Sequence, residues 1–386
     1  ADALQLARGE ALAAFGSDDL ILERLIEGAR HVEIQVLVDG AGQAVHLGER
    51  DCSVQRRHQK LIEEAPCPVL TPALRERMGA AALAAAAAID YRGAGTVEFL
   101  LDADNNFWFL EMNTRLQVEH PVTECLTGLD LVEWQLRIAR GEAMNVTQSD
   151  LRFDGHAIEA RLYTEDPDQG FIPTTGPIDL WEAPTDPTIR TDAGVTSGQQ
   201  ITPWYDALAA KIIAWGETRE VARRRLVAAL REAVLFGPAT NKAFLIACLE
   251  DDRFRDGRAT TAFCDERAPS AGQPTGPADI EAATAAVLWF WHDRERARGA
   301  TAGIAPDLLD WHSGTRLPSR YLLEADDRAF DTAIEPLGSG RYRVQGPAGE
   351  YAVSLIHGRA GPVAADLDGL RQRVHPQRGG ADGLWV

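Results

Sequence analysis

Apolar and polar residues alternate along several stretches of the chain, and this pattern predicts β-strands. Every second residue from Val32 to Val38 is apolar, which is typical of a half-buried strand over residues 31–39. A turn rich in Asp and Gly joins it to a second strand over 43–47. The alternation returns at 156–163, where apolar and mostly charged side chains face opposite ways.

Helices are predicted between these strands by longer runs of helix-forming residues. Pro72 suits the first turn of one of them, and Gly141 ends another. The predicted helices cover residues 2–15, 71–90, 129–140, 217–231 and 241–249. Strands and helices mixed in this way indicate an α/β (α+β) fold.

A β-hairpin is predicted at 96–113, and its register brings two carboxylates together. Its strands, 96–102 and 107–113, flank a four-residue polar turn. With a loop of that length, Glu98 lies opposite Glu111. The same register pairs Leu100 with Phe109 and Asp102 with Phe107.

Glu98 and Glu111 would repel each other across this hairpin unless a cation lies between them. Asn113 shares their face, and these oxygen ligands suit Mg²⁺ (or Mn²⁺) bound together with phosphate groups. The alternative interpretation is that the strands pair in a shifted register and that these side chains lie on a solvent-exposed face without a metal. The next segment favours the metal site, because Arg115, Gln117 and Glu119 alternate there and would present a cation, an amide and a carboxylate to one small anion.

A short basic run is unusual in a chain this acidic. The formal charge of −19 argues against a nucleic-acid partner and an anionic membrane surface. Gln55, His58 and Lys60 lie in the run QRRHQK, where they could bind ribose and phosphate oxygens. An exposed loop that carries a run of charges is the alternative interpretation.

The cysteines and the hydropathy pattern limit the class of protein further. The five cysteines have neither C-x-x-C nor zinc-type spacing, which is typical of reduced thiols in a cytoplasmic protein. We expect neither a signal peptide nor a membrane span, because the sequence contains no apolar run of the necessary length.

The composition changes after residue 268. Residues 269–279 are rich in Pro, Gly and Ala, as a linker is. A helix is predicted over 280–298, and short alternating runs recur between 320 and 375, separated by Gly, Pro and Asp. This order predicts a helix followed by a small antiparallel sheet or barrel.

Two long motifs identify a family. EMNTRLQVEHPVTE, which begins at Glu111, and ERDCSVQRRHQKLIEEAP, residues 49–66, closely resemble signatures of the biotin carboxylases in the ATP-grasp superfamily. The resemblance covers residues 1–268. It implies the C-terminal half of an ATP-grasp domain at 1–146 and a biotin carboxylase C-terminal domain at 147–268. We expect the family's N-terminal domain and glycine-rich lid to be missing.

The order of elements after the linker is similar to that of acyl-CoA carboxylase α subunits, in which a helix and a β-barrel-like domain bridge carboxylase and carboxyltransferase. The resemblance implies such a bridging domain at 280–386, a carboxyltransferase β subunit as partner, and an oligomer. It leaves open methylcrotonoyl-, propionyl-, acetyl- or geranyl-CoA as the acceptor. The expected compartment is the cytoplasm, or the mitochondrial matrix in a eukaryote.

The resemblance also assigns ligands to residues. Those expected to bind ATP are Glu23, Arg24, Leu25, His31, Gln55, His58, Glu98 and Glu111. Those expected to bind Mg²⁺ (or Mn²⁺) are Glu98, Glu111 and Asn113. An ordinary half-exposed strand position is the alternative interpretation of His31.

The family reaction joins bicarbonate to biotin at the expense of ATP. The bicarbonate-binding residues that the resemblance implies are Lys60, Arg115, Gln117 and, through its backbone, Val118. Glu119 is the implied base that deprotonates bicarbonate for attack on the γ-phosphate. Arg161 is implied to stabilise the biotin enolate, although an ordinary Arg–Glu pair is the alternative.

We expect biotin to arrive on a separate carrier domain. The family attaches biotin to a lysine flanked by methionines, and none of Lys60, Lys211 and Lys242 adjoins a methionine. Without a lid, the 386-residue chain alone is expected to be inactive. Two alternatives to this function stay open: another ATP-grasp ligase, such as a carbamoyl-phosphate-type enzyme or pyruvate carboxylase, or an assembly module that docks a carboxyltransferase subunit.

Overall fold

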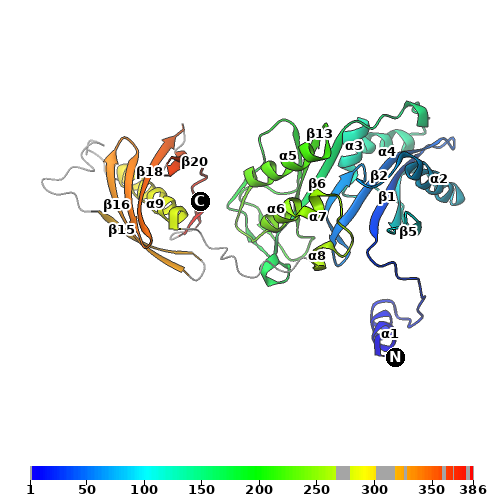
Figure 1. Cartoon of the computed structure of the whole chain (residues 1–386), viewed down its shortest axis with the longest axis horizontal. Helices are drawn as coiled ribbons and strands as arrows, with labels where there is room; N and C mark the ends of the chain where they lie inside the picture. The colour runs from blue at the N-terminus through cyan, green and yellow to red at the C-terminus, as the bar shows by residue number, and fades with distance from the viewer. Residues whose placement is uncertain are drawn as a thin grey trace.

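The computed structural model describes residues 2–266, 279–300, 318–325, 328–358, 362–367, 369–379 and 383–385. Figure 1 shows a large sheet with several helices from the first part of the chain, and a smaller sheet with one long helix from the last part. The mixed α/β fold and the helix-plus-sheet region at the C-terminal end are therefore confirmed. The predicted linker at 269–279 lies outside the described residues, except for Asp279.

An antiparallel sheet of eight strands forms the centre of the first part. From edge to edge its strands are β11 (Ile189–Ala193), β13 (Leu208–Gly216), β6 (His156–Tyr163), β3 (Gln59–Ala65), β2 (Ala44–Arg56), β1 (Arg30–Val38), β4 (Gly93–Leu101) and β5 (Phe107–Asn113). Because β3 pairs with β6, strands on both sides of residue 146 belong to one sheet. This pairing brings side chains near position 60 next to side chains near position 160.

Helices pack on both faces of this sheet. On one face, α2 (Pro72–Ala88) packs on β1 and β4, and α5 (Arg219–Glu232) and α6 (Lys242–Glu250) pack on β6 and β13. On the other face lie α3 (His120–Thr127) and α4 (Leu131–Ala139), which contact apolar residues near the strand ends. The middle of this second face is polar, and it carries the candidate site.

The remaining elements of the first part are short, apart from the first helix. They are α1 (Asp2–Phe15), η1 (Gln148–Asp150), β7 (Glu165–Asp166), η2 (Pro167–Gln169), β8 (Ile172–Pro173), β9 (Gly176–Pro177), β10 (Leu180–Glu182), β12 (Gln200–Ile201), β14 (Val234–Phe236), α7 (Asp252–Arg255) and α8 (Phe263–Glu266). α1 contains no buried residue, and Figure 1 shows an extended segment between it and β1.

β1 is buried on both faces, which corrects the prediction of a half-buried strand. Its apolar side chains pack against α2, as expected. His31, Glu33 and Gln35 lie on the opposite face, where side chains from neighbouring strands contact them and all three are buried. Alternation of apolar and polar residues usually marks one solvated face, but here the polar face is enclosed as well.

In the last part, α9 (Asp279–Ala300) lies against one face of a six-stranded antiparallel meander (Figure 1). Its strands, in order, are β15 (Ser319–Ala325), β16 (Arg328–Gly338), β17 (Arg341–Gly346), β18 (Gly349–His357), β19 (Pro362–Leu367) and β20 (Leu370–Arg373), and β21 (Gln377–Gly379) pairs with β22 (Gly383–Trp385). Ala286 and Val287 of α9 pack in one core with Ile334 and Val353 of the sheet. Within the described parts of the chain, no helix has the length and hydropathy needed to cross a membrane.

Candidate active site

The β4–β5 hairpin places Glu98 opposite Glu111, as the sequence predicts. The rest of the predicted register is wrong, because Phe109 lies opposite Phe99 rather than Leu100, and Phe107 opposite Leu101 rather than Asp102. The Asp102 carboxylate accepts hydrogen bonds from the backbone N–H groups of Asp104 and Asn106, so Asp102 belongs to the turn. The turn is therefore longer than predicted. A register shift between Glu98 and Phe99, typical of a β-bulge, compensates for the longer turn, so that Glu98 still lies opposite Glu111.

Three glutamates lie side by side across the second face of the sheet. Glu33 of β1 is the cross-strand partner of Glu98 of β4, which is the partner of Glu111 of β5. On its other side, Glu33 pairs with Arg50 of β2. Neighbouring carboxylates repel each other, so the row is stable only with cations close to it. Arg50 and Lys60 supply that charge.

Arg50 is completely buried, and the reasoning from sequence missed it. Its guanidinium donates to five side chains at 2.5–3.0 Å, those of Glu33, Gln35, Thr96, Gln117 and Thr123. These partners come from β1, β4, α3 and the loop after β5, so Arg50 ties four segments together. The strand predicted over 43–47 continues in the structure to Arg56, so the signal, an arginine in the middle of a long buried strand, is visible only once these bounds are known.

The basic run forms the β2–β3 hairpin. Arg57 and His58 occupy its turn with φ values of 47° and 68°, which are typical of a two-residue type I′ turn. Both are exposed, as the alternative interpretation of a charged loop requires. Gln55 is buried instead, and its amide nitrogen lies 3.1 Å from Nδ1 of His31. Lys60, on the returning strand, reaches into the row of glutamates.

Lys60 joins three carboxylates. Its Nζ donates to Glu33 at 2.6 Å, to Glu98 at 2.9 Å and to Glu119 at 2.6 Å. Burial alone would lower the pKa of Lys60, but these carboxylates raise it well above its usual range. Lys60 is therefore a permanent cation at the centre of the site.

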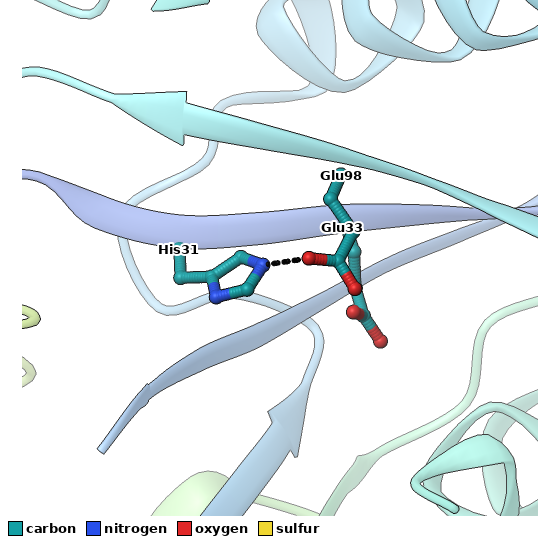
Figure 2. A group of neighbouring side chains, drawn as sticks. All are labelled: His31, Glu33 and Glu98. Carbon is teal, nitrogen blue, oxygen red and sulfur yellow. Dashed lines mark hydrogen bonds and ion pairs between the residues drawn. The ribbon is translucent and has the colours of Figure 1, made fainter. Parts of the chain in front are cut away.

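His31 is buried beside the same row, so the alternative of a half-exposed strand position is wrong. Figure 2 shows its ring directed at Glu98, with 2.6 Å between Nε2 and Oε2. Burial raises the pKa of Glu98, but the hydrogen bond from His31 and the charge of Lys60 lower it to about 2. Arg50 and Lys60 overcome burial in the same way and lower the pKa of Glu33 to about 2. Both carboxylates are ionised at neutral pH.

Glu98, Glu111 and Asn113 converge, as the predicted metal site requires. The Asn113 Nδ2 donates to Oε1 of Glu98 at 2.9 Å and to Oε1 of Glu111 at 3.1 Å. Carboxylate oxygens that meet in this way are the hard donors that Mg²⁺ and Mn²⁺ prefer. A flip of the Asn113 amide exchanges its nitrogen for its oxygen, which turns the donor into a ligand. The residues present therefore fit a divalent cation.

The loop after β5 contributes the three side chains expected to bind an anion. Gln117 is buried, and its amide donates to Glu98 at 2.7 Å and accepts from Arg50 at 2.9 Å. Arg115 is exposed and donates only to a neighbouring backbone carbonyl; among the residues that the structure describes, it forms no ion pair. Glu119 is 1% exposed. Arg115 is thus a cation whose charge is not neutralised by a carboxylate.

Both carboxylate oxygens of Glu119 are held by cations. Oε1 accepts from Lys60 at 2.6 Å, and Oε2 accepts from Nη2 of Arg161 at 2.8 Å. The Nε of Arg161 donates to Glu63 at 2.5 Å. Arg161 does belong to an Arg–Glu pair, as the alternative interpretation says, but one of its two partners is the proposed base.

Lys211 fixes the backbone of the same loop, although no pattern in the sequence assigned it to the site. Its Nζ donates to the carbonyl oxygen of Val118 at 2.8 Å and lies 3.3 Å from Asp192. Lys211 is the cross-strand partner of Arg161 on β13 and β6. This pairing is the signal for its role, and it is visible only once the strands are aligned.

Most of these groups line one cavity of about 980 Å³. Its walls include the predicted site residues Leu25, His31, Gln55, His58, Lys60, Glu98, Glu111, Asn113, Arg115, Gln117, Val118, Glu119 and Arg161. Glu23 and Arg24 are exposed and are not part of these walls; the Arg24 guanidinium lies 5.2 Å from the ring centroid of Trp108.

Two family models match the chain, and both motifs lie within the region matched by the first. Residues 1–147 match the family described as "Carbamoyl-phosphate synthase L chain, ATP binding domain". Residues 159–266 match the family described as "Biotin carboxylase C-terminal domain". The fold and these two matches thus place the chain in the ATP-grasp class.

Curated relatives and solved structures agree with this class. A biotin carboxylase from Nostoc is 50% identical over 260 residues, which are 67% of this chain and 58% of that protein. The mitochondrial methylcrotonoyl-CoA carboxylase subunit alpha of Rattus norvegicus is 49% identical over 67% of this chain and 36% of its own length. The biotin carboxylase domain of a Hydrogenobacter thermophilus 2-oxoglutarate carboxylase, solved with MgADP and bicarbonate, is 48% identical, with a TM-score of 0.67 over 69% of this chain and 58% of that one.

The chain belongs to the biotin carboxylase family, as its two motifs predict. It spans between about a third and three fifths of the length of the relatives just named. Relatives named for methylcrotonoyl-CoA, 2-oxoglutarate and pyruvate carboxylases match at 49%, 48% and 47% identity. The matched region therefore does not distinguish between those acceptors.

Proposed function

We propose that this chain provides the site at which a biotin carboxylase activates bicarbonate with ATP and passes the carboxyl group to biotin. The observation that carries the proposal is the position of Glu119. It is a buried carboxylate in the wall of the cavity, held by Lys60 and Arg161. Arg115, a cation without a carboxylate partner among the described residues, lines the same cavity. A small anion can thus meet a cation and a base at one place.

Bicarbonate would be held by Arg115, Lys60, Gln117 and the backbone at Val118. Glu119 removes its proton, and the resulting carbonate oxygen attacks the γ-phosphorus of ATP. The bond to ADP breaks, and carboxyphosphate forms. Lys60 and Arg161 fix both oxygens of the base, so that it needs little reorganisation when the anion binds.

Biotin would be carboxylated in the second half of the reaction. Carboxyphosphate releases CO₂, and the phosphate that remains takes the N1′ proton of biotin. Arg161 would then stabilise the enolate by an electrostatic interaction that is stronger because the site is buried. N1′ of the enolate attacks CO₂, and the new C–N bond gives carboxybiotin. Biotin would come from a separate carrier: the ammonium groups of Lys60, Lys211 and Lys242 donate to oxygens of this chain, and no side chain of the three is fully exposed.

The nucleotide would lie along the rest of the cavity. We assign Leu25, together with Glu23 and Arg24 through their backbone, to the adenine, and His31, Gln55 and His58 to the ribose and phosphates. Glu98, Glu111 and Asn113 would hold Mg²⁺ or Mn²⁺, which supplies positive charge to the phosphate oxygens. His31 keeps the Glu98 carboxylate oriented by its hydrogen bond.

In the active carboxylase that contains this chain, Glu111→Gln should reduce ATP cleavage strongly at limiting Mg²⁺ and hardly change folding. Glu111 is exposed at the edge strand and forms no ion pair within the described residues, so the neutral amide removes a metal ligand and little else. Turnover as a function of Mg²⁺ concentration measures the effect, and denaturant unfolding provides the control for stability. An unchanged rate at limiting Mg²⁺ would remove Glu111 from the metal site.

Fixation of ¹⁴C-bicarbonate onto biotin tests the function as a whole. Label should reach biotin only when ATP and Mg²⁺ are both present, in the active carboxylase that contains this chain. ATP hydrolysis that does not depend on bicarbonate, with no label on biotin, would contradict the proposal and favour another ATP-grasp reaction.

We also propose an acyl-CoA carboxylase α subunit, with residues 280–386 as the bridge to a carboxyltransferase β subunit. Separate hydrophobic cores support a division of the chain into two parts. The first part comprises 1–146 and 147–268, and the second comprises 280–386. The core of the last part consists of residues from Ile280 onward. Two exposed ion pairs, Arg373–Glu232 at 2.9 Å and His375–Glu182 at 3.0 Å, link it to the first part.

Deletion of residues 280–386 should leave the first part folded and abolish association with a carboxyltransferase subunit. The loss of two exposed ion pairs costs little stability, since such pairs contribute about 0–1 kcal/mol each. Gel filtration with the carboxyltransferase subunit measures association, and circular dichroism checks the fold. A complex formed by the truncated chain would place the docking surface elsewhere.

A further inference from the structure

Two buried glutamates lie behind Arg161, and the proposed reaction does not use them. Glu63 of β3 and Glu159 of β6 are cross-strand partners, and both are 0% exposed. One oxygen of Glu63 accepts the hydrogen bond from Arg161. The other oxygen of Glu63 and both oxygens of Glu159 have no hydrogen-bond partner among the described residues.

Two ionised carboxylates are not stable in this arrangement. Opposite positions on neighbouring strands bring side chains close together, and like charges there repel. Without water to screen them, two such carboxylates cannot both ionise, so one of them holds a proton. A shared proton also gives an otherwise unpaired oxygen a hydrogen-bond donor.

The charges around the pair favour the same state. Arg161, Glu119 and Lys60 face Glu63, and Lys211 faces Glu159 from β13, with the Cys125 thiol nearby on α3. Lys211 also lies 3.3 Å from Asp192, so part of its charge is already compensated.

Burial is also the main influence on the pKa of each carboxyl. It raises the pKa of Glu63 above its usual range, although Arg161 opposes the change. It also raises the pKa of Glu159 well above its usual range, and the charge of Glu63 adds to the effect.

We propose that Glu63 and Glu159 share one proton at neutral pH and act as a single negative charge that positions Arg161. This inference rests on the proposed role of Arg161 toward biotin. Glu63 and Glu159 are positioning residues, because they act through Arg161. Loss of the shared proton would place a second negative charge behind Arg161 and weaken its pull on the enolate.

The shared proton makes stability depend on pH in a defined direction. The pair binds one more proton in the folded chain than in the unfolded chain, where ordinary carboxyls near pKa 4.3 are ionised at pH 7. The pair makes its full contribution to stability below about pH 4.3. This contribution is lost as the pH rises toward the pKa of the pair in the folded chain. The unfolding equilibrium constant should therefore rise about tenfold per pH unit in this window, relative to Glu159→Gln.

Infrared spectroscopy of the 386-residue chain at pH 7 tests the sharing directly. The wild type should show the C=O stretch of a protonated carboxyl. Glu159→Gln should lose it, because the remaining Glu63 keeps the hydrogen bond from Arg161 and ionises. Glu64→Gln is the matched control on β3: hydrogen bonds from His156 and Arg219 lower the pKa of Glu64 against the effect of burial, so this variant keeps the band.

Two outcomes would overturn the inference. One is a wild type without a protonated carboxyl at pH 7. The other is a band that persists in Glu159→Gln, which would mean that the proton does not depend on Glu159. These measurements do not involve turnover, so they stand or fall separately from the proposed carboxylation. In an active enzyme, Glu159→Gln should also move the alkaline fall of biotin carboxylation to higher pH and leave nucleotide affinity unchanged.

Discussion

Glu119→Gln should lower bicarbonate-dependent turnover by roughly 10²- to 10⁴-fold in the active carboxylase that contains this chain, the usual contribution of a general base. The amide keeps the size of the side chain but cannot accept the proton of bicarbonate. Lys60 retains Glu33 and Glu98, and Arg161 retains Glu63, so the surrounding network keeps most of its ion pairs. Initial rates at saturating and limiting bicarbonate separate loss of the base from loss of binding.

Nucleotide affinity distinguishes this role from a structural one. Binding of MgADP to the Glu119→Gln variant should change little, because Glu119 contacts cations and not the proposed metal ligands. Glu133→Gln is a suitable control, since this exposed glutamate lies on α4 outside the cavity. If the loss were confined to nucleotide binding, Glu119 would have to be reassigned from base to nucleotide ligand.

The sequence predicted the site best where it is contiguous in the chain. The motif from Glu111 to Glu119 forms one edge of the cavity, and most of its assigned side chains line it. Glu98 was placed opposite Glu111 correctly, although two errors cancelled: the turn before β5 is longer than predicted, and a bulge absorbs the difference. Neither feature can be read from alternation, because a bulge adds a residue without changing the apolar pattern of the strand.

The charged residues behind the site could not be predicted in the same way. Glu63 and Arg161 are 98 positions apart, and only the pairing of β3 with β6 brings them together. Glu33 looks like the polar half of a half-buried strand until Arg50 of β2 and Lys60 of β3 cover it. Hydrophobic periodicity reports which face is apolar, and it cannot report that the polar face is buried too.

Arg50→Met should destabilise the chain by about 3–5 kcal/mol, the usual cost of removing one partner from a buried ion pair. Methionine is close to the arginine stem in size, so the loss comes mainly from charge and hydrogen bonds. The variant leaves the buried Glu33 with Lys60 alone and removes the donors to Gln35, Thr96 and Gln117. Urea unfolding followed by tryptophan fluorescence measures the change.

A double variant shows whether an uncompensated charge is the cause. Glu33→Gln added to Arg50→Met removes that charge, so the double variant should be more stable than Arg50→Met alone. Arg137→Met is the matched control: Arg137 pairs with Glu133 and Glu142 on the surface, and its loss should cost less than about 1 kcal/mol. Equal losses of stability in Arg50→Met and Arg137→Met would contradict a central role of Arg50. Equal stability of the single and double variants at position 50 would show that its hydrogen bonds to neutral side chains, rather than its charge, hold the four segments together.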